Sequence, residues 1–113
     1  MGISPFYRGA DCNYWAMKDK NFHLVGSTIH FINKKLDGGD ILFYVKPKIQ
    51  HDPFLFSMST VKETVSTIVK IIKNKKIKKF KSFKQDKKKV IRLTKKSDFL
   101  KENLDFFKKI RVN

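Results

Sequence analysis

The chain has 113 residues, of which 41% are hydrophobic and 13% aromatic, and its formal net charge is +16. This length allows one domain at most, and the composition is too apolar for a chain that is disordered throughout. The longest apolar runs, such as residues 41–45, are far shorter than the roughly 20 residues that span a bilayer, and a single cysteine, Cys12, excludes an internal disulfide and favours a cytoplasmic setting.

The first half of the chain predicts a loop, a short helix and a β-hairpin. Residues 2–9 contain two glycines and a proline and are expected to form a loop, followed by a short helix over 10–18. Polar and apolar residues alternate over 26–33, which is typical of a strand. A second strand is expected over 40–45, after a turn that contains two adjacent glycines. Two strands joined by so short a loop are most simply an antiparallel hairpin.

A helix is predicted after the hairpin. The loop over 51–56 precedes a capping-box pattern, in which Thr60 is followed three residues later by Glu63. We therefore expect a helix from about Thr60 to Lys73. Its apolar residues recur at helical spacing and predict one stripe that faces the core, made of Val61, Val65, Ile68 and Ile72.

The last third is rich in lysine. Residues 73–89 are expected to hold a loop and 89–94 a short strand. Ser97 is expected to cap a final helix that ends near Ile110, with Leu100, Leu104 and Phe107 facing inward. We divide the chain into a front part, residues 1–73, and a lysine-rich C-terminal extension, residues 74–113.

The charge is concentrated in that last part. Residues 1–69 carry eight Lys or Arg against six Asp or Glu (+2), and residues 70–113 carry 18 against four (+14), which sum to +16. Such a segment could attract nucleic acid or an anionic membrane. Lysine outnumbers arginine by 23 to 3, whereas phosphate clamps and base readers tend to use arginine. An ordinary lysine-covered surface is therefore the simpler interpretation.

Two residues of the hairpin are candidates for chemistry. Asp37 lies in the glycine-flanked turn, where a carboxylate can take a proton or orient a histidine, although on composition alone it is more simply a turn residue. A lone strand histidine such as His30 is more often a structural residue, but both side chains can point to the same end of the hairpin. The sequence has no metal-ligand pattern and no nucleotide-binding motif, and nothing near Cys12 would activate a thiolate.

Three blocks of sequence, taken together, resemble a known family. They are Ile-Ser-Pro-Phe-Tyr-Arg-Gly at 3–9, Gly-Ser-Thr-Ile-His-Phe at 26–31 and Leu-Asp-Gly-Gly-Asp-Ile-Leu at 36–42. Their order and spacing are similar to the catalytic half of the formyltetrahydrofolate-dependent formyltransferases, which act on methionyl-tRNA, glycinamide ribonucleotide or sugar amines. The resemblance implies an α/β fold: the C-terminal part of an open-sheet domain, made of a β-hairpin and packing helices.

The resemblance also implies roles for individual residues. Asp37 matches the family's catalytic aspartate and His30 the strand histidine close to it. The expected pocket wall comprises Ser4, Pro5, Tyr7, Leu36 and Gly38. The formyl donor would be 10-formyltetrahydrofolate, and the acceptor an amine of a sugar, a nucleotide precursor or an aminoacyl-tRNA.

The sequence departs from the family pattern at its start. By the family's spacing, the catalytic Asn and His would lie just before Met1, in a Rossmann-like N-terminal half that is missing here. We therefore expect a fragment that is inactive alone, with a complementary N-terminal half as a possible partner. The alternatives are a small basic nucleic-acid-binding protein that uses the lysine-rich half, and a remnant without function.

Overall fold

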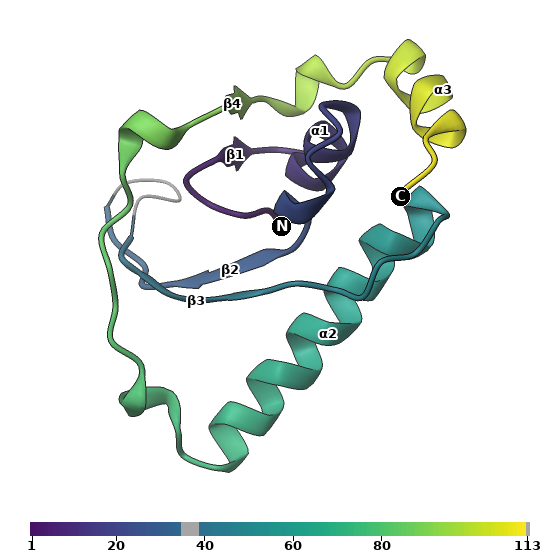
Figure 1. Ribbon diagram of the computed structural model, residues 1–113. Coiled ribbons are helices and arrows are strands. Elements are labelled where there is room, and N and C mark those ends of the chain that lie inside the picture. The colour runs from purple at the N-terminus through teal and green to yellow at the C-terminus, as the bar shows by residue number, and fades with distance from the viewer. Residues whose placement is uncertain (35–38, 113) are drawn as a thin grey trace.

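The computed structural model describes residues 1–34 and 39–112 and shows a mixed α/β arrangement, as predicted (Figure 1). Its strands and helices, in chain order, are β1 (Tyr7–Gly9), α1 (Cys12–Lys18), β2 (Ser27–His30), β3 (Ile41–Val45), α2 (Pro53–Lys73), β4 (Arg92–Thr94) and α3 (Lys101–Lys109). The described strands form two separate pairs, β1 with β4 and β2 with β3.

The predicted hairpin is confirmed. β2 and β3 pair in antiparallel register, with Thr28 opposite Tyr44, and a bulge follows at the end of β2. β2 is shorter than the predicted 26–33, because the chain leaves the sheet after His30. A backbone hydrogen bond of 2.9 Å from Phe31 N to Asp40 O still joins the two arms beyond the strands.

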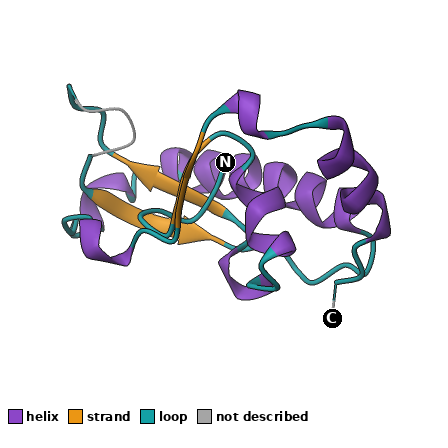
Figure 2. Ribbon diagram, turned by 90° about the horizontal axis from the view of Figure 1, so that it is seen from above, coloured by secondary structure: helices purple, strands orange, loops and turns teal. Residues whose placement is uncertain are grey.

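Opposite faces of the hairpin contact different layers of the molecule, because successive strand side chains point to opposite faces. On one face, Thr28 Oγ1 and Tyr44 Oη donate hydrogen bonds to the carbonyls of Gly2 (2.7 Å) and Ser4 (2.5 Å). On the other, the hydroxyl of Ser27 lies 2.5 Å from that of Thr64 on α2. In Figure 2, viewed from above, the strands lie alongside the long helix.

The predicted start of α2 at Thr60 is wrong, because the helix begins seven residues earlier, at Pro53. Asp52 is the N-cap, and its carboxylate accepts a hydrogen bond of 3.0 Å from Leu55 N. Proline directly after such a cap is pre-organised for the first turn. Thr60 lies in mid-helix and donates its hydroxyl proton to the carbonyl of Phe56, four residues earlier.

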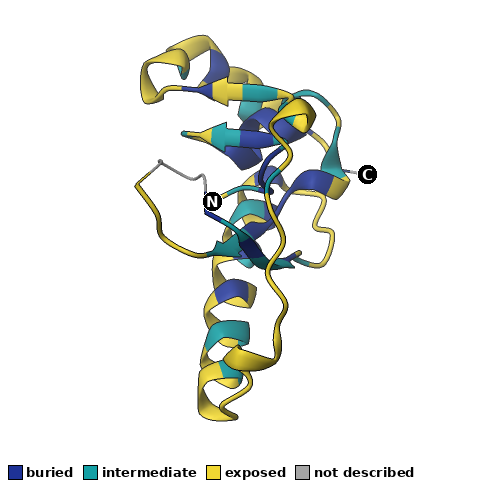
Figure 3. Ribbon diagram, turned by 90° about the vertical axis from the view of Figure 1, so that its left-hand side faces the viewer, coloured by how far each residue is buried: buried dark blue, intermediate teal, exposed yellow. Residues whose placement is uncertain are grey.

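The predicted direction of the α2 stripe is also wrong. The helix buries Phe56, Thr60 and Thr64 against the hairpin and α1, whereas Val65 is 56% exposed and Ile72 is 61% exposed. Periodicity shows that an apolar face exists, but not what covers it. In Figure 3 much of α2 is exposed, including the end far from the rest of the fold.

Residues after 73 pack against the front of the chain. β4 pairs in parallel with β1, with Tyr7 opposite Arg92 and Gly9 opposite Thr94. Gly9 has φ +94°, and a Cβ there would overlap the carbonyl of Thr94. Val112 is fully buried, and its N–H donates to the carbonyl of His51 at 3.1 Å.

The end of the chain differs from its prediction in two respects. α3 starts at Lys101 rather than at Ser97, with Asn103 Oδ1 accepting the N–H of Leu100 at 2.9 Å. Leu100 and Leu104 were predicted to face inward and are instead exposed, and the residue that α3 buries is Asn103. The central core gathers side chains from both ends of the chain: Ile3, Tyr7, Cys12, Tyr14, Trp15, Ala16, Met17, Leu24, Val25, Phe56, Ile110 and Val112.

Candidate functional site

A cavity of about 310 Å³ lies between the N-terminal loop and β2. Three of the residues singled out from the sequence line it together: Ser4, Tyr7 and His30. Thr64 of α2 also lines this cavity, so both layers that cover the hairpin contribute to its wall. Pro5 is buried next to Ser4, through a cis peptide bond, but does not line the cavity.

Ser4 is held by the hairpin. Its N–H donates to Thr28 Oγ1 at 2.9 Å, and its carbonyl accepts from Tyr44 Oη at 2.5 Å. Both partners come from opposing positions of β2 and β3, so the N-terminal loop and the sheet are positioned as one unit. Burial raises the pKa of Tyr44, which keeps its hydroxyl protonated and able to donate.

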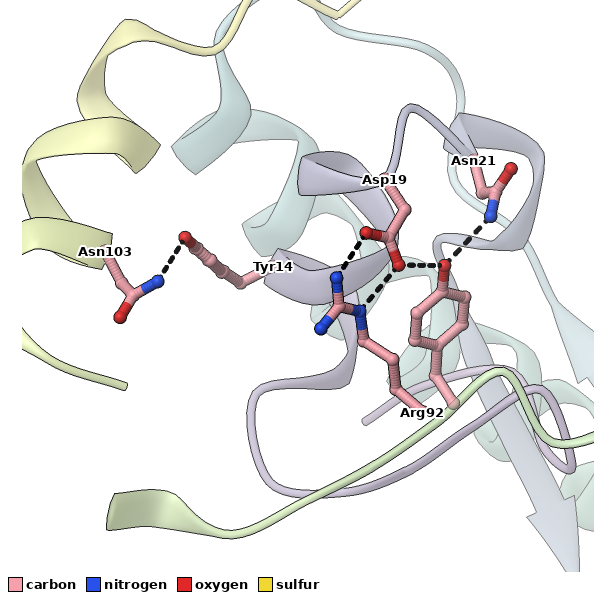
Figure 4. Close-up of polar contacts among 6 residues, drawn as sticks. Tyr14, Asp19, Asn21, Arg92 and Asn103 are labelled. Carbon is pink, nitrogen blue, oxygen red and sulfur yellow. Dashed lines mark hydrogen bonds and ion pairs between the residues drawn. The ribbon is translucent and has the colours of Figure 1, made fainter. Parts of the chain in front are cut away.

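Tyr7 lines the cavity, but its hydroxyl is engaged elsewhere. The hydroxyl donates to Asp19 Oδ2 at 2.9 Å and accepts from Asn21 Nδ2 at 2.9 Å, and both of these partners are labelled in Figure 4. Burial is the main cause that raises the pKa of Tyr7 to about 12. Tyr7 is therefore a fixed part of the wall, and its hydroxyl is unsuited to proton transfer at neutral pH.

Asp19 is held in turn by Arg92, a pair that sequence reasoning missed. Arg92 Nη2 and Nε lie 2.7 Å from Asp19 Oδ1 and Oδ2, and the guanidinium carbon lies 4.9 Å from the centroid of the Trp15 ring. The hydrogen bonds from Arg92 are the largest of the causes that lower the pKa of Asp19. No local pattern signals this pair, because the two residues lie 73 positions apart.

His30 is the last residue of β2, and its side chain lies close to Gly39, on the other arm of the hairpin. Its Nδ1 is 2.8 Å from the carbonyl oxygen of Phe31, and a Cβ at Gly39 would overlap that same carbonyl and approach His30 Nδ1. Glycine is thus required at 39 by close packing. The carbonyl of Gly39 also accepts a hydrogen bond of 2.7 Å from Gln85 Nε2, which ties this arm to the C-terminal part.

Three predicted site residues, Leu36, Asp37 and Gly38, lie outside the described residues. Both arms that enter and leave their loop are described, and both meet at His30, in the wall of the cavity.

The cavity has the size and chemistry for part of a ligand. Its volume is at the lower end of the range of about 300–1,000 Å³ that small-molecule sites span. The residues that line it are mixed in character, with Ser4, Ser27, Thr28, His30 and Thr64 beside Tyr7 and Ile29. Within residues 1–34 and 39–112, no group of three or more His, Cys, Asp or Glu side chains could hold a metal ion.

The lysine-rich segment runs along the outer side of β3. The backbones of Ile41 and Phe83 exchange two hydrogen bonds of 2.7 and 2.9 Å, and the rings of Phe43 and Phe80 lie 4.8 Å apart. These contacts attach the segment to the hairpin, while its lysines are exposed at positions 75, 76, 78, 79, 81, 84, 87, 88 and 89. No helix in the described part of the chain is both long enough and apolar enough to cross a membrane.

Comparison with known proteins identifies similar structures. The chain resembles a 4-N formyltransferase from Francisella tularensis, with a TM-score of 0.68 and 23% identity over 87% of this chain and 40% of that chain. It also resembles a sugar N-formyltransferase candidate from Mycobacterium tuberculosis, with a TM-score of 0.66 and 21% identity over 87% of this chain and 41% of that chain. No family model and no curated protein matches the sequence.

These similarities show that the chain has a formyltransferase-type fold. It spans about two fifths of the length of the structures that it matches. The match extends beyond the front part that carried the sequence resemblance, because 87% of the chain exceeds the share of residues 1–73, which is 73/113 or about 65%. At least part of the lysine-rich extension therefore belongs to the shared fold.

Proposed function

We propose that this chain forms part of a formyl-transfer site that uses a 10-formyl reduced folate as donor and an amine as acceptor. The observation that carries the proposal is the cavity in which Ser4, Tyr7 and His30 meet beside the arms of the Asp37 loop. The formyltransferase-type fold supports the same assignment, although identity of 21–23% shows the fold alone.

In this proposal Asp37 is the catalytic group and His30 supports its loop. The acceptor nitrogen forms a bond to the formyl carbon, and the bond from that carbon to the folate nitrogen breaks. One proton leaves the amine, and the folate nitrogen gains one. Asp37 accepts the amine proton as a general base, while Ser4, Tyr7, Leu36 and Gly38 form the wall against the folate ring and Pro5 supports that wall from behind.

Turnover requires the whole of a formyl-transfer site, and these 113 residues span only 40–41% of the structures that they match. Acyl transfer depends strongly on donors that stabilise the developing oxyanion, and the family resemblance assigns these donors to an Asn and a His outside the three matching blocks. Loss of one member of such a catalytic set typically costs several orders of magnitude in rate. Donor binding is therefore a better test than turnover.

Isothermal titration with a non-transferable 10-formyl folate analogue tests the proposal. In the proposal the Asp37 loop also lies against the folate ring, and the Asp37 carboxylate accepts a hydrogen bond from that ring. The chain should bind the analogue, and Asp37→Asn should weaken binding at least about tenfold, which corresponds to a loss of about 1.4 kcal/mol. Asp40→Asn removes a carboxylate three residues away and should change the affinity less than twofold. Absence of binding, or equal losses in the two variants, would contradict the assignment.

Polyanion binding by the lysine-rich segment is a second candidate function. It is favoured by the attachment of Phe80 and Phe83 to the hairpin, which leaves the neighbouring lysines exposed. Removing residues 74–113 would not test it, because β4 and Val112 contribute to the fold. Charge reversal at Lys78, Lys79, Lys81 and Lys84 should abolish salt-dependent retention on RNA, whereas reversal at Lys20, Lys46, Lys48 and Lys62 should not.

A further inference from the structure

One polar side chain of the lysine-rich segment is partly buried. Every residue from 72 to 89 is exposed except Gln85, which is half-buried between two exposed neighbours, Lys84 and Asp86. Transfer of an amide group from water into a protein costs free energy unless its polar atoms find hydrogen-bond partners. Gln85 is therefore held by specific contacts, whereas the lysines around it stay in water.

The backbone of the segment is fixed close to Gln85. Two residues before it, Phe83 exchanges hydrogen bonds of 2.7 and 2.9 Å with the backbone of Ile41, on the outer side of β3. The rings of Phe83 and Tyr44 lie 6.0 Å apart. Tyr44 in turn donates a hydrogen bond to the carbonyl of Ser4, in the wall of the cavity. These contacts set the position from which the side chain of Gln85 reaches the hairpin.

Gln85 holds the arm of the hairpin that packs against His30. Its Nε2 donates a hydrogen bond of 2.7 Å to the carbonyl of Gly39. A Cβ added at Gly39 would overlap the carbonyl of Phe31 and lie 3.2 Å from His30 Nδ1. His30 Nδ1 itself lies 2.8 Å from the same carbonyl oxygen, and His30 lines the cavity. One glycine therefore separates Gln85 from the cavity wall.

The position of Gly39 depends on contacts from outside. A glycine has no side chain that could anchor its own backbone, and its conformation is the least restricted of any residue. Hydrogen bonds fix the chain at this point, from Gln85 to the carbonyl of Gly39 and, at 2.9 Å, from Phe31 N to the carbonyl of Asp40. Loss of the bond from Gln85 would allow the arm to shift relative to His30.

We propose that Gln85 is a positioning residue of the ligand site: by holding the carbonyl of Gly39, it keeps His30 and the end of β2 in the arrangement that binds the formyl donor. The inference rests on the proposed function, because the donor is the ligand whose binding it explains. It gives the lysine-rich segment a role that does not depend on charge, unlike polyanion binding. Gln85 acts through Gly39 and does not contact the donor itself.

The test compares two glutamine substitutions in the full chain. Gln85→Met keeps the approximate length of the side chain and removes the N–H donor. Gln50→Met makes the same change at the only other glutamine of the sequence, which is exposed after β3. Neither substitution changes the net charge, so the long-range attraction of an anionic folate is the same in both variants. Urea unfolding establishes that each variant is folded before urea is added.

Isothermal titration with the non-transferable 10-formyl folate analogue measures the affinity, and NMR spectra of the unbound chain record the ring-proton signals of His30. We expect Gln85→Met to raise the dissociation constant about fivefold, the effect of one lost hydrogen bond, and to shift the His30 signals. Gln50→Met should leave both unchanged. A contribution to stability alone would lower the urea midpoint without moving either readout.

Three results would overturn the inference and leave the proposed function intact. They are equal affinities of the two variants, His30 signals that Gln85→Met does not move, and a Gln85→Met chain that is unfolded without urea, because Gln85 would then be required for the fold itself. Failure of the unmodified chain to bind the analogue would instead overturn the proposed function, and the inference with it. The two failures are therefore distinguishable.

Discussion

Arg92 of β4 donates hydrogen bonds of 2.7 Å to both carboxylate oxygens of Asp19, although the two residues lie 73 positions apart in the chain. The same carboxylate accepts a hydrogen bond from the hydroxyl of Tyr7, which is one of the residues that line the candidate site. Arg92 therefore holds Asp19, and Asp19 in turn holds Tyr7 in place. The cavity that Tyr7 lines is formed by residues from the first 30 positions and by Thr64 of α2.

Breaking the Arg92 pair should destabilise the fold measurably. Arg92→Gln should lower the free energy of unfolding by about 1–2 kcal/mol, because a bidentate charge-assisted pair is lost from a partly solvated site. Lys88→Gln, an exposed change with the same loss of charge, should cost less than about 0.5 kcal/mol. Urea unfolding measures both values, and similar losses would show that Arg92 acts only as surface charge.

The contribution of Asp19 should disappear in acid. Its pKa in the folded chain is lowered, chiefly by Arg92, relative to the value of about 3.9 in the unfolded chain. The stabilisation is therefore fully present above the unfolded pKa and is lost as the pH falls through the lower, folded pKa. Unfolding free energies of the chain and of Asp19→Asn should differ at pH 6, and the difference should shrink as the pH falls through the folded pKa; a constant difference would contradict the assignment.

Tyr7 should ionise later than an exposed tyrosine. Burial raises its pKa to about 12, so absorbance at the phenolate band should show part of the tyrosine titration well above pH 10. Tyr7→Phe should remove the latest part of that titration. Stability tied to the neutral hydroxyl is present below the unfolded pKa of about 10 and lost as pH rises toward 12. If the titration curve of Tyr7→Phe keeps its late phase, the tyrosine with the pKa of about 12 is not Tyr7.

Two phenylalanines of α2 should behave in opposite ways. Phe56 is 1% exposed and belongs to the core, so Phe56→Ala should cost about 3–5 kcal/mol of unfolding free energy. Phe54 lies two residues away and is 58% exposed, so Phe54→Ala should cost less than about 1 kcal/mol. Chemical denaturation of the isolated chain compares them directly, and a larger cost at Phe54 would reverse the assignment of the buried face.

Local patterns predicted the hairpin well, because strand alternation and a glycine turn are encoded within a few residues. One failure was local: residues 51–56 were predicted to be a loop, although Asp52 and Pro53 start the helix, and Thr60 instead donates back to the preceding turn. The other failure concerned a distant contact. Periodicity found the α2 stripe but could not show that Thr64 would face Ser27 while Val65 faces solvent.

The candidate site was predictable only in part. The family resemblance, and not any single residue, placed Ser4, Tyr7 and His30 in one site, and the structure brings these three to one cavity. The roles of Asp37, Leu36 and Gly38 stay predictions. No sequence pattern predicted the contacts of Asp19 with Tyr7 and Arg92, because Arg92 comes near the other two residues only when β4 pairs with β1.

The most direct test of the proposed donor site is a two-dimensional amide NMR titration of the chain with tetrahydrofolate. The account predicts saturable shifts confined to residues 2–9, to 28–31 and to the arms of the Asp37 loop, with little change in β4 or α3. Shifts that gather instead on the lysine-rich segment, or that grow without saturating, would contradict a folate site beside β2.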